Sequence, residues 1–251
     1  MVNVIIIPVH NQLAYLKKCV ASVIKHTKDY ELIIVDDGST ELDMKEWLSE
    51  NEGIFTLLIN ETAQGFSNAC NKGIQYAMNN FDFYCLCLLN SDAETITENW
   101  FDKVNACFES DEKIGIAGVV SNNAMTQTIH DVNKYMKKID EKPTLYCHLI
   151  HGFCYFISKK LIYKIGMLDE FTFPHYGSED DYSMKSLRAG FNNIIVGSVM
   201  VLHNNETSYT HQVRADYLKY SMPNFLNRWG RSYINDCGAQ ATKIGKHLNN
   251  I

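Results

Sequence analysis

Residues 84–89 form a short, continuous apolar run that stops abruptly at Asn90, Ser91 and Asp92, and this stretch constrains the fold most strongly. A run of this kind is typical of a strand buried on both faces, as in the middle of a parallel sheet. Ligands of open α/β sheets bind at the carboxyl ends of the strands, so Asp92 is expected at that edge. A carboxylate there suits a hard divalent cation, and the cation suits a diphosphate. The same three residues also suit an ordinary turn, and this stretch alone leaves both interpretations open.

The composition narrows the class of protein. The 251 residues are 46% apolar, which is enough for one large α/β domain or two small ones with a sizeable core. The formal net charge of −6 argues against broad nucleic-acid binding, because that binding needs a basic face. An anionic ligand would therefore be held by a local device, such as a metal ion or backbone amides.

The cysteines and the apolar runs indicate a compartment. The chain has 8 cysteines and no Cys-x-x-Cys pair, which argues against a zinc site and favours reduced thiols in a reducing compartment. The amino-terminal residues lack the pattern of a secretory signal, and no apolar stretch is long enough to span a bilayer. We predict a soluble, cytoplasmic protein, and peripheral contact with the inner face of a membrane stays open.

Two further apolar runs, residues 4–7 and 32–35, are separated by a helical pattern, and the second ends in Asp36 and Asp37. Strand, helix and strand in this order predict a βαβ unit with the acids at the carboxyl edge of the sheet. Paired acids at that edge can accept hydrogen bonds from a ribose or a base N–H. They can equally form a polar turn in which one acid caps the next element.

Gly65 follows a third predicted strand, residues 55–59, and precedes a helical pattern. A glycine at this place can leave backbone amides free for an anion. It can equally be an ordinary loop glycine at a helix entry. The Gly-x-Gly-x-x-Gly pattern is absent, so the sequence does not predict a dinucleotide-binding fold.

Three consecutive acids, Glu179, Asp180 and Asp181, stand at the start of a helical pattern that ends near Gly190. The helix dipole stabilises acids in a first turn, which is one sufficient explanation. A cap needs only one acid, however, and three acids repel each other unless cations or donors lie opposite. Crowded carboxylates at a helix start also suit a general base and the binding of hydroxyl groups.

His203 follows the last predicted strand, residues 192–202, as Asp92 follows its own strand. A single histidine is more often structural than a ligand. Two side chains at the same edge of a sheet can nevertheless converge on one ion.

The remaining segments are less regular. Residues 121–147 are polar without clear periodicity, which is typical of a lid, a binding loop or a mobile insertion. Residues beyond 210 fit a helix packed on the domain better than a basic-aromatic surface for a membrane or partner. We therefore divide the chain into a domain of residues 1–210 and a C-terminal helical extension, residues 211–251, packed on it.

Taken in order, these motifs resemble the family 2 inverting glycosyltransferases with the GT-A fold. The resemblance is carried by residues 5–11 (IIIPVHN), 31–40 (ELIIVDDGST), 64–73 (QGFSNACNKG), 89–92 (LNSD), 179–181 (EDD), 188–191 (RAGF) and 201–203 (VLH). It implies a GT-A-like single α/β domain whose central sheet is mostly parallel and flanked by helices.

The resemblance also implies which residues contact the donor. Asp37 would accept a hydrogen bond from the nucleotide base with Asp36 supporting the same pocket, and Pro8 and His10 would line the nucleotide site. The other implied donor-contacting positions are Asn11, Gly65, Asn68, Asn90 and Ser91.

A divalent ion, Mn²⁺ or Mg²⁺, is implied between Asp92 and the donor's diphosphate, with His203 as a further ligand or diphosphate contact. Asn90 stands where the family's metal motif begins with an acid, which leaves the number of direct ligands open.

Asp180 would be the general base, and Glu179 and Asp181 would place acceptor or sugar hydroxyls. This mechanism requires Asp92 and Asp180 to converge across the sugar.

The function implied is a metal-dependent inverting transfer of a sugar from a UDP- or dTDP-linked donor to a hydroxyl of a glycan or glycoconjugate, in surface polysaccharide assembly. One alternative is a sugar-nucleotidyltransferase, which should carry a Gly- and Arg/Lys-rich loop where this chain has residues 10–12. Another alternative is a catalytically silent nucleotide-sugar-binding module, which should lack a base or a metal residue, whereas Asp92, Asp180 and His203 are all present. The sequence does not indicate the oligomeric state.

Overall fold

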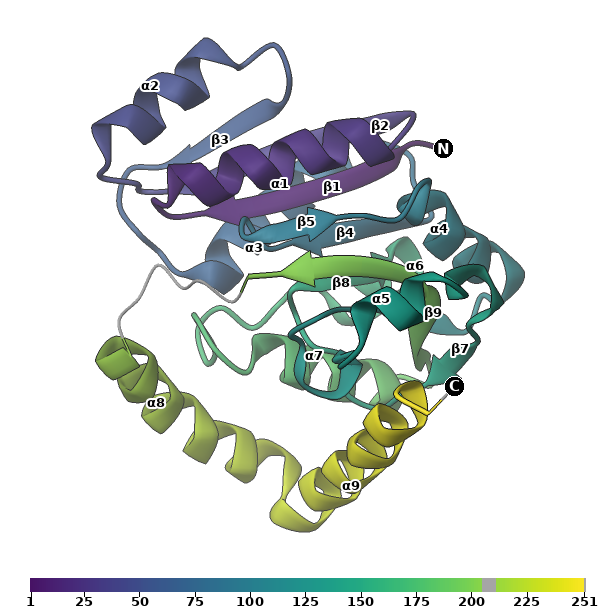
Figure 1. The fold of residues 1–251 in the computed structure, drawn as a ribbon. Helices are drawn as coiled ribbons and strands as arrows, with labels where there is room; N and C mark the ends of the chain where they lie inside the picture. The colour runs from purple at the N-terminus through teal and green to yellow at the C-terminus, as the bar shows by residue number, and fades with distance from the viewer. Residues whose placement is uncertain (205–210, 251) are drawn as a thin grey trace.

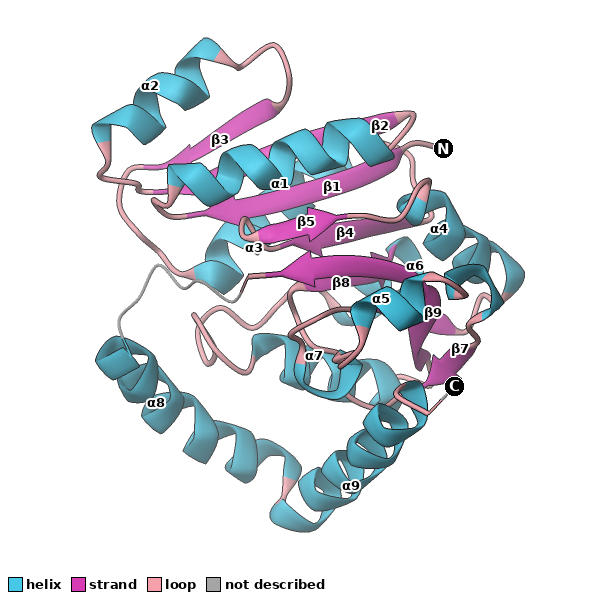
Figure 2. Ribbon diagram, viewed as in Figure 1, coloured by secondary structure: helices cyan, strands magenta, loops and turns pink. Residues whose placement is uncertain are grey.

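The computed structural model describes residues 1–204 and 211–250 as a central β-sheet with helices packed on it (Figure 1). Figure 2 shows the sheet through the middle of the molecule and helices on both sides of it. The predicted fold class, an α/β domain with a mostly parallel central sheet flanked by helices, is confirmed.

The elements have the following bounds. The strands are β1 (Asn3–Val9), β2 (Tyr30–Asp37), β3 (Thr56–Asn60), β4 (Cys85–Leu89), β5 (Ala93–Thr95), β6 (Ile114–Val120), β7 (Thr144–Tyr146), β8 (Cys154–Ser158) and β9 (Asn192–His203). The α-helices are α1 (Leu13–His26), α2 (Leu42–Glu50), α3 (Phe66–Asn80), α4 (Trp100–Ser110), α5 (Val132–Met136), α6 (Lys159–Ile165), α7 (Ser178–Arg188), α8 (His211–Trp229) and α9 (Arg231–Leu248). Two short 3₁₀ helices are η1 (Met125–Gln127) and η2 (Ile139–Glu141).

The strand order places the ends of four strands at one edge of the sheet. The order is β3-β2-β1-β4-β8-β6-β9-β5, and β7 also pairs with β9. Strands β3, β2, β1 and β4 are parallel, β8 is antiparallel to both β4 and β6, and β9 is parallel to β6. All five residues of β4 are buried, so the apolar run of residues 84–89 contains a central strand, as predicted. The carboxyl ends of β1, β2, β4 and β9 therefore share one edge.

The two faces of the sheet bury separate cores. Alternate residues of β1 point to opposite faces, so Ile5 and Ile7 join one core and Val4 joins the other. The first core includes apolar residues of α1 and α4, and the second includes residues of α3, α6 and α7. A Cβ at Gly73 would collide with the side chain of Ile6, so α3 lies close against β1 because this position has no side chain. The two cores pack against both faces of the sheet and so fix the positions of the strand ends.

Residues 121–147 have more regular structure than the sequence predicted. They contain η1, α5, η2 and β7, and β7 pairs with β9. Tyr135 and Ile139 from this segment are buried in the core. Each element is only a few residues long, so none could produce a visible periodicity in the sequence.

The C-terminal part begins with α8 and ends with α9 (Figure 1). A small third core joins these helices to the rest of the chain and contains Phe173, Met184, Phe225, Trp229 and Cys237. The boundary that we predicted after residue 210 falls beside residues 205–210, which lie outside the described part of the chain. None of the helices in residues 1–204 and 211–250 combines the length and apolar character needed to cross a membrane.

Candidate active site

Polar side chains gather where β1, β2, β4 and β9 end. Pro8 is the penultimate residue of β1, Asp37 is the last residue of β2, and His203 is the last residue of β9. Asn90 and Ser91 directly follow β4. The shared edge of the sheet thus brings together residues from distant parts of the sequence.

Asp92 and His203 form a close, buried pair at this edge. Oδ1 of Asp92 lies 3.4 Å from Nε2 of His203, and their side chains are only 9% and 5% exposed. The side-chain nitrogen of Asn90 also lies 3.4 Å from Nε2 of His203. Antiparallel pairing of β5 with β9 places Ala93 opposite His203, which fixes the approach of the two backbones. Asp92 and His203 therefore lie side by side, as their positions at two strand ends predicted.

The neighbours of His203 fix the orientation of its ring. Nδ1 lies 2.8 Å from the backbone carbonyl of Asn123, and because a carbonyl only accepts, Nδ1 carries the proton and donates it. The ring stacks on Phe153 at 5.1 Å between centroids, and Asn122 accepts a hydrogen bond from the backbone of His203. In the neutral ring, Nε2 then carries a lone pair, and both Oδ1 of Asp92 and Nδ2 of Asn90 lie 3.4 Å from it. Asn122 and Asn123 were not predicted as site residues, because their only signal in the sequence was their position just after β6.

This arrangement fits a divalent cation. A histidine lone pair and a carboxylate facing each other repel unless a proton or a cation lies between them. A metal-ligating histidine usually donates its other ring N–H to a carbonyl or carboxylate, as His203 does here. In the residues that the structure describes, no group of three or more His, Cys, Asp or Glu side chains is placed to hold a metal ion. Asp92 and His203 can therefore supply two ligands, and further oxygens would come from a phosphate-bearing ligand or water.

Asp37 is buried and holds the loop that leads into α3. Its Oδ1 accepts hydrogen bonds from Asn60 Nδ2 and the backbone of Gln64, both at 2.8 Å, and its Oδ2 accepts one from the backbone of Gly65, also at 2.8 Å. His10 Nδ1 donates to the backbone carbonyl of Asp37 at 2.8 Å. The amide of Gly65 is thus engaged by Asp37, which contradicts the interpretation that this glycine leaves its amide free for an anion.

Gly65 is required for two reasons. Its φ of 102° is a conformation that side chains disfavour, and a Cβ here would lie 2.7 Å from the carbonyl oxygen of Pro174.

Asn68, in the first turn of α3, donates to Glu170 at 3.2 Å, and Ser67 Oγ donates to the carbonyl of Phe173 at 2.5 Å. These contacts attach the loop before α7 to the start of α3.

Asn11 and Asp36 organise the loop between β2 and α2. Oδ1 of Asn11 accepts hydrogen bonds from the backbone of Thr40 at 2.8 Å and of Glu41 at 3.1 Å. Oδ1 of Asp36 accepts one from the backbone of Ser39 at 2.9 Å, and Ser39 Oγ accepts one from the backbone of Asn11. The side chains of Asn11 and Asp36 therefore fix the conformation of the loop that follows Asp37.

Glu179 and Asp180 are half-buried at the start of α7. Burial raises the pKa of Asp180 to about 7, and the negative charges of Glu179 and Asp181 add to the effect. Burial also raises the pKa of Glu179. Protons therefore leave these carboxyl groups at higher pH than from exposed acids, which suits proton transfer near neutral pH.

Residues 151 and 152 lie close to both the acids of α7 and the Asp92–His203 pair. A Cβ at Gly152 would lie 3.0 Å from Cγ of Glu179, so Glu179 packs directly on this glycine. The ring of His151 lies 6.0 Å from the ring of His203, centroid to centroid. The chain from His151 to Gly152 thus connects the two groups of side chains across a short distance.

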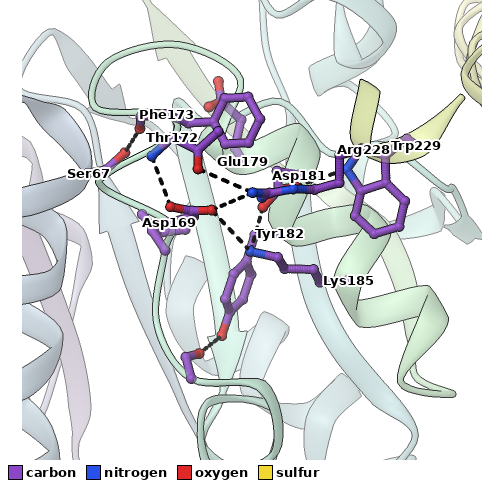
Figure 3. A network of polar contacts seen from close by, with 12 residues as sticks. Ser67, Asp169, Thr172, Phe173, Glu179, Asp181, Tyr182, Lys185, Arg228 and Trp229 are labelled. Carbon is purple, nitrogen blue, oxygen red and sulfur yellow. Dashed lines mark hydrogen bonds and ion pairs between the residues drawn. The ribbon is translucent and has the colours of Figure 1, made fainter. Parts of the chain in front are cut away.

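Asp181 differs from its two neighbours, and our expectation that it places hydroxyl groups needs correction. It is fully buried, and its Oδ1 accepts hydrogen bonds from Arg228 Nη1 and Trp229 Nε1, both at 2.9 Å (Figure 3). Its Oδ2 forms an ion pair with Lys185 Nζ at 2.7 Å. The carboxylate is therefore occupied within the protein. The C-terminal residues were predicted to pack on the domain, and these contacts with Asp181 were not predicted.

A family model supplies the identification. The model described as "Glycosyl transferase family 2" matches residues 4–166, which is more than half of the chain. The chain belongs to glycosyl transferase family 2. The match covers Asp37, Gly65 and Asp92 but ends before α7, so the family 2 model itself does not include the acids of α7 or His203.

Curated relatives of this family 2 chain match it over only part of their own length. The uncharacterised protein y4gI of Sinorhizobium fredii is 24% identical over 232 residues, which cover 83% of this chain and 25% of that protein. A PGL/p-HBAD biosynthesis glycosyltransferase of Mycobacterium tuberculosis is 38% identical over 76 residues, 29% of this chain and 30% of that protein. The matched segments thus span about a quarter to a third of the length of these relatives.

Two solved structures share the fold of the family 2 chain. GalNAc-T7, solved with UDP, GalNAc and Mn²⁺, gives a TM-score of 0.70 at 16% identity, over 98% of this chain and 55% of that chain. The mannosyltransferase PcManGT from Pyrobaculum calidifontis, solved with GDP-Man and Mn²⁺, gives 0.65 at 13% identity, over 98% and 73%. These likenesses confirm the GT-A-like fold.

Proposed function

We propose that this family 2 chain is a metal-dependent inverting glycosyltransferase that uses a UDP- or dTDP-linked sugar and a hydroxyl acceptor. The observation that carries the proposal is the arrangement at the sheet edge. His151 lies 6.0 Å from His203 of the Asp92–His203 pair, and Gly152, the next residue, packs on Glu179, with Asp180 next to it in the chain. A donor sugar between these groups would have its diphosphate toward the pair and its open face toward the acids.

On the donor side, Asp37 and His10 form the wall of a nucleotide pocket, with Asp36, Asn11, Pro8, Gly65 and Asn68 supporting it from the adjoining loops. Each carboxylate oxygen has two lone pairs, and Oδ2 of Asp37 accepts one hydrogen bond from Gly65 in the structure, so it can also accept one from a base N–H. Mn²⁺ or Mg²⁺, held by Asp92 and His203 near Asn90 and Ser91, would neutralise the charge of the departing diphosphate when bound.

On the acceptor side, Asp180 takes the proton of the attacking hydroxyl, and Glu179 places that hydroxyl. A pKa of about 7 is well matched to this task, because about half of the base is then ionised at neutral pH and it still binds a proton well. Attack from the side opposite the leaving group inverts the anomeric carbon in one step. One base is sufficient for this reaction, and no covalent intermediate is needed.

The setting we propose is surface polysaccharide or glycoconjugate assembly by a cytoplasmic protein that can touch a membrane peripherally. Buried, free thiols and an acidic composition support a reducing compartment and argue against nucleic acid as a partner. We also propose that residues 1–210 form the catalytic domain and residues 211–251 an extension packed on it. Membership of glycosyl transferase family 2 favours sugar transfer over the sugar-nucleotidyltransferase alternative.

The test is a thermal-shift panel of UDP-, dTDP- and GDP-sugars, each with and without Mn²⁺. A ligand that binds only the folded state raises the melting temperature by mass action. We expect a Mn²⁺-dependent shift with a UDP- or dTDP-sugar, which is lost in Asp92→Ala and in His203→Ala. Asp236→Ala removes an exposed acid of α9 and serves as the matched control. A panel without any shift in the presence of Mn²⁺ would refute donor binding at this edge.

A further inference from the structure

The end of α8 lies against the start of α7, although the two are far apart in the sequence. Arg228 Nη1 and Trp229 Nε1 both donate to Oδ1 of Asp181 at 2.9 Å. Figure 3 shows the two side chains converging on this carboxylate from the same helix end. Asp181 is fully buried and directly follows Asp180 in the chain.

Arg228 also reaches the loop that precedes α7. Its Nη2 donates to Oδ2 of Asp169 at 2.8 Å and to Oγ1 of Thr172 at 3.2 Å. The guanidinium therefore connects two carboxylates through separate nitrogen atoms of its planar fork. The ammonium of Lys185 lies near the same two carboxylates, at 2.7 Å from Asp181 and 4.0 Å from Asp169. The loop and the first turn of α7 are fixed relative to each other through Arg228.

Apolar packing holds this contact in place. Trp229 is 8% exposed, and the guanidinium of Arg228 lies over the ring of Phe173 at 5.1 Å from its centroid. Phe173 in turn packs against Phe225 of α8 at 6.2 Å between ring centroids. A partly desolvated ion pair of this kind has little freedom to reorient.

The charges explain why the first turn of α7 needs such a partner. Three consecutive carboxyl groups repel each other, and two of them, on Glu179 and Asp180, have a raised pKa. Asp181 is the member of the three whose charge is balanced, by Arg228 and by Lys185. Its fixed position determines where the preceding two residues can lie, because all three belong to the same helical turn.

We propose that Arg228 and Trp229 are positioning residues that hold Asp181 and thereby place Glu179 and Asp180 opposite the Asp92–His203 pair. This inference rests on the proposed function, in which Asp180 is the base. It gives the C-terminal extension a part in turnover, because α8 supplies both residues. Neither side chain contacts the reacting atoms in this proposal.

The experiment compares Arg228→Gln and Trp229→Phe with Arg231→Gln, a matched change of charge at an exposed position in α9. Release of UDP or dTDP from the donor identified in the panel measures kcat and KM. Calorimetry with UDP or dTDP and Mn²⁺ measures binding at the donor site. We expect kcat to fall ~100-fold in Arg228→Gln, because a shift of about 1 Å in a catalytic group costs that much. Trp229→Phe should lose less, and Arg231→Gln should match the wild type.

A positioning role predicts a pattern that general unfolding does not. The KM for the donor and the affinity for the nucleotide should stay within about twofold of the wild type. The reason is that the residues of the proposed nucleotide pocket come from β1, β2, α3 and their loops. Asp181→Asn should lower kcat, and adding it to Arg228→Gln should cause little further loss, since both changes break the same link. A parallel loss of kcat, nucleotide affinity and melting temperature would overturn the proposal, and so would an unchanged kcat in Arg228→Gln.

Amide hydrogen exchange separates this inference from the proposed function. Arg228→Gln should speed exchange in residues 178–182 selectively, whereas Arg231→Gln should not. If the wild type releases no nucleotide from any donor, the proposed function fails on that result alone, and exchange still decides whether Arg228 fixes the turn. Unchanged exchange in residues 178–182 would overturn the positioning role whatever the activity.

Discussion

Two groups of acidic side chains lie at the same edge of the sheet and differ in how their charges are satisfied. Asp37, at the end of β2, is 4% exposed and accepts three hydrogen bonds, two of them from backbone amides. Asp180, at the start of α7, has two acidic neighbours, and burial together with their charges raises its pKa to about 7. Hydrogen-bond donors make Asp37 a structural residue. Burial and the neighbouring charges give Asp180 a pKa that suits proton transfer near neutral pH.

The contrast extends to the neighbours of each acid. Asp36 accepts a hydrogen bond from the backbone of Ser39, so both acids of β2 stabilise loops. In α7, Asp181 is similarly engaged by the side chains of Arg228 and Trp229, whereas Glu179 accepts a hydrogen bond from Ser178 Oγ at 3.2 Å. Carboxylates at one sheet edge therefore divide into those that hold the site together and those left for chemistry.

The largest effect should come from Asp180→Asn, which removes the proposed base without changing the size of the side chain. We expect kcat to fall about 10³-fold, within the range that general bases contribute, while binding of UDP or dTDP with Mn²⁺ is retained. Nucleotide release and calorimetry measure the two quantities. If Asp180→Asn keeps most of its activity and Glu179→Gln loses it, the base is Glu179 and the assignment of the two acids reverses.

The second effect is on stability. Asp37→Ala leaves the amides of Gln64 and Gly65 and the side chain of Asn60 without their acceptor, and we expect a loss of ~2–4 kcal/mol in the free energy of unfolding. Urea denaturation measures it, with Asp236→Ala as the control for removal of an exposed acid. A loss as small as that of the control would show that Asp37 does not anchor the loop.

The third effect is a gain in stability, in contrast to the loss expected for Asp37→Ala, and it depends on pH. The pKa of Asp180 is raised in the folded protein, so its ionisation weakens folding, and that loss develops as pH rises from the unfolded-state value through about 7. Asp180→Asn should therefore melt a few degrees higher than the wild type at about pH 8 and equally at about pH 4. Thermal denaturation at the two pH values decides, and an equal shift at both would contradict the raised pKa.

The smallest effect concerns Asp169. Burial works against its ionisation, but hydrogen bonds from Thr172 and Arg228 outweigh it and lower the pKa of Asp169. Its stabilising effect is present above the unfolded-state pKa and is lost as pH falls through the lower folded-state value. We expect Asp169→Asn to cost ~1 kcal/mol near neutral pH, and less in acid, because the pair is partly exposed. A cost that does not change with pH would rule out the ion pair as its cause.

The strands that carry the site, and the side chains at their ends, were predictable from the sequence. Asp92 is found just after β4, Asp36 and Asp37 are the last two residues of β2, and His203 is the last residue of β9. An apolar run and its boundary are local features, because side-chain burial within a strand repeats over a few residues. The residues at the carboxyl edge of the sheet could therefore be predicted before the structure was known.

The contacts among those residues were settled only by the tertiary structure. The lone pair of His203 is directed by the carbonyl of Asn123, in a segment whose elements are too short to show periodicity. The role of Asp181 depends on Arg228 and Trp229, which reach it from the C-terminal helices. Such pairs depend on how β8, α7 and α8 pack in space, and no local pattern encodes that packing. The sequence by itself determined which chemical groups line the edge, and the packing decided which are available to a substrate.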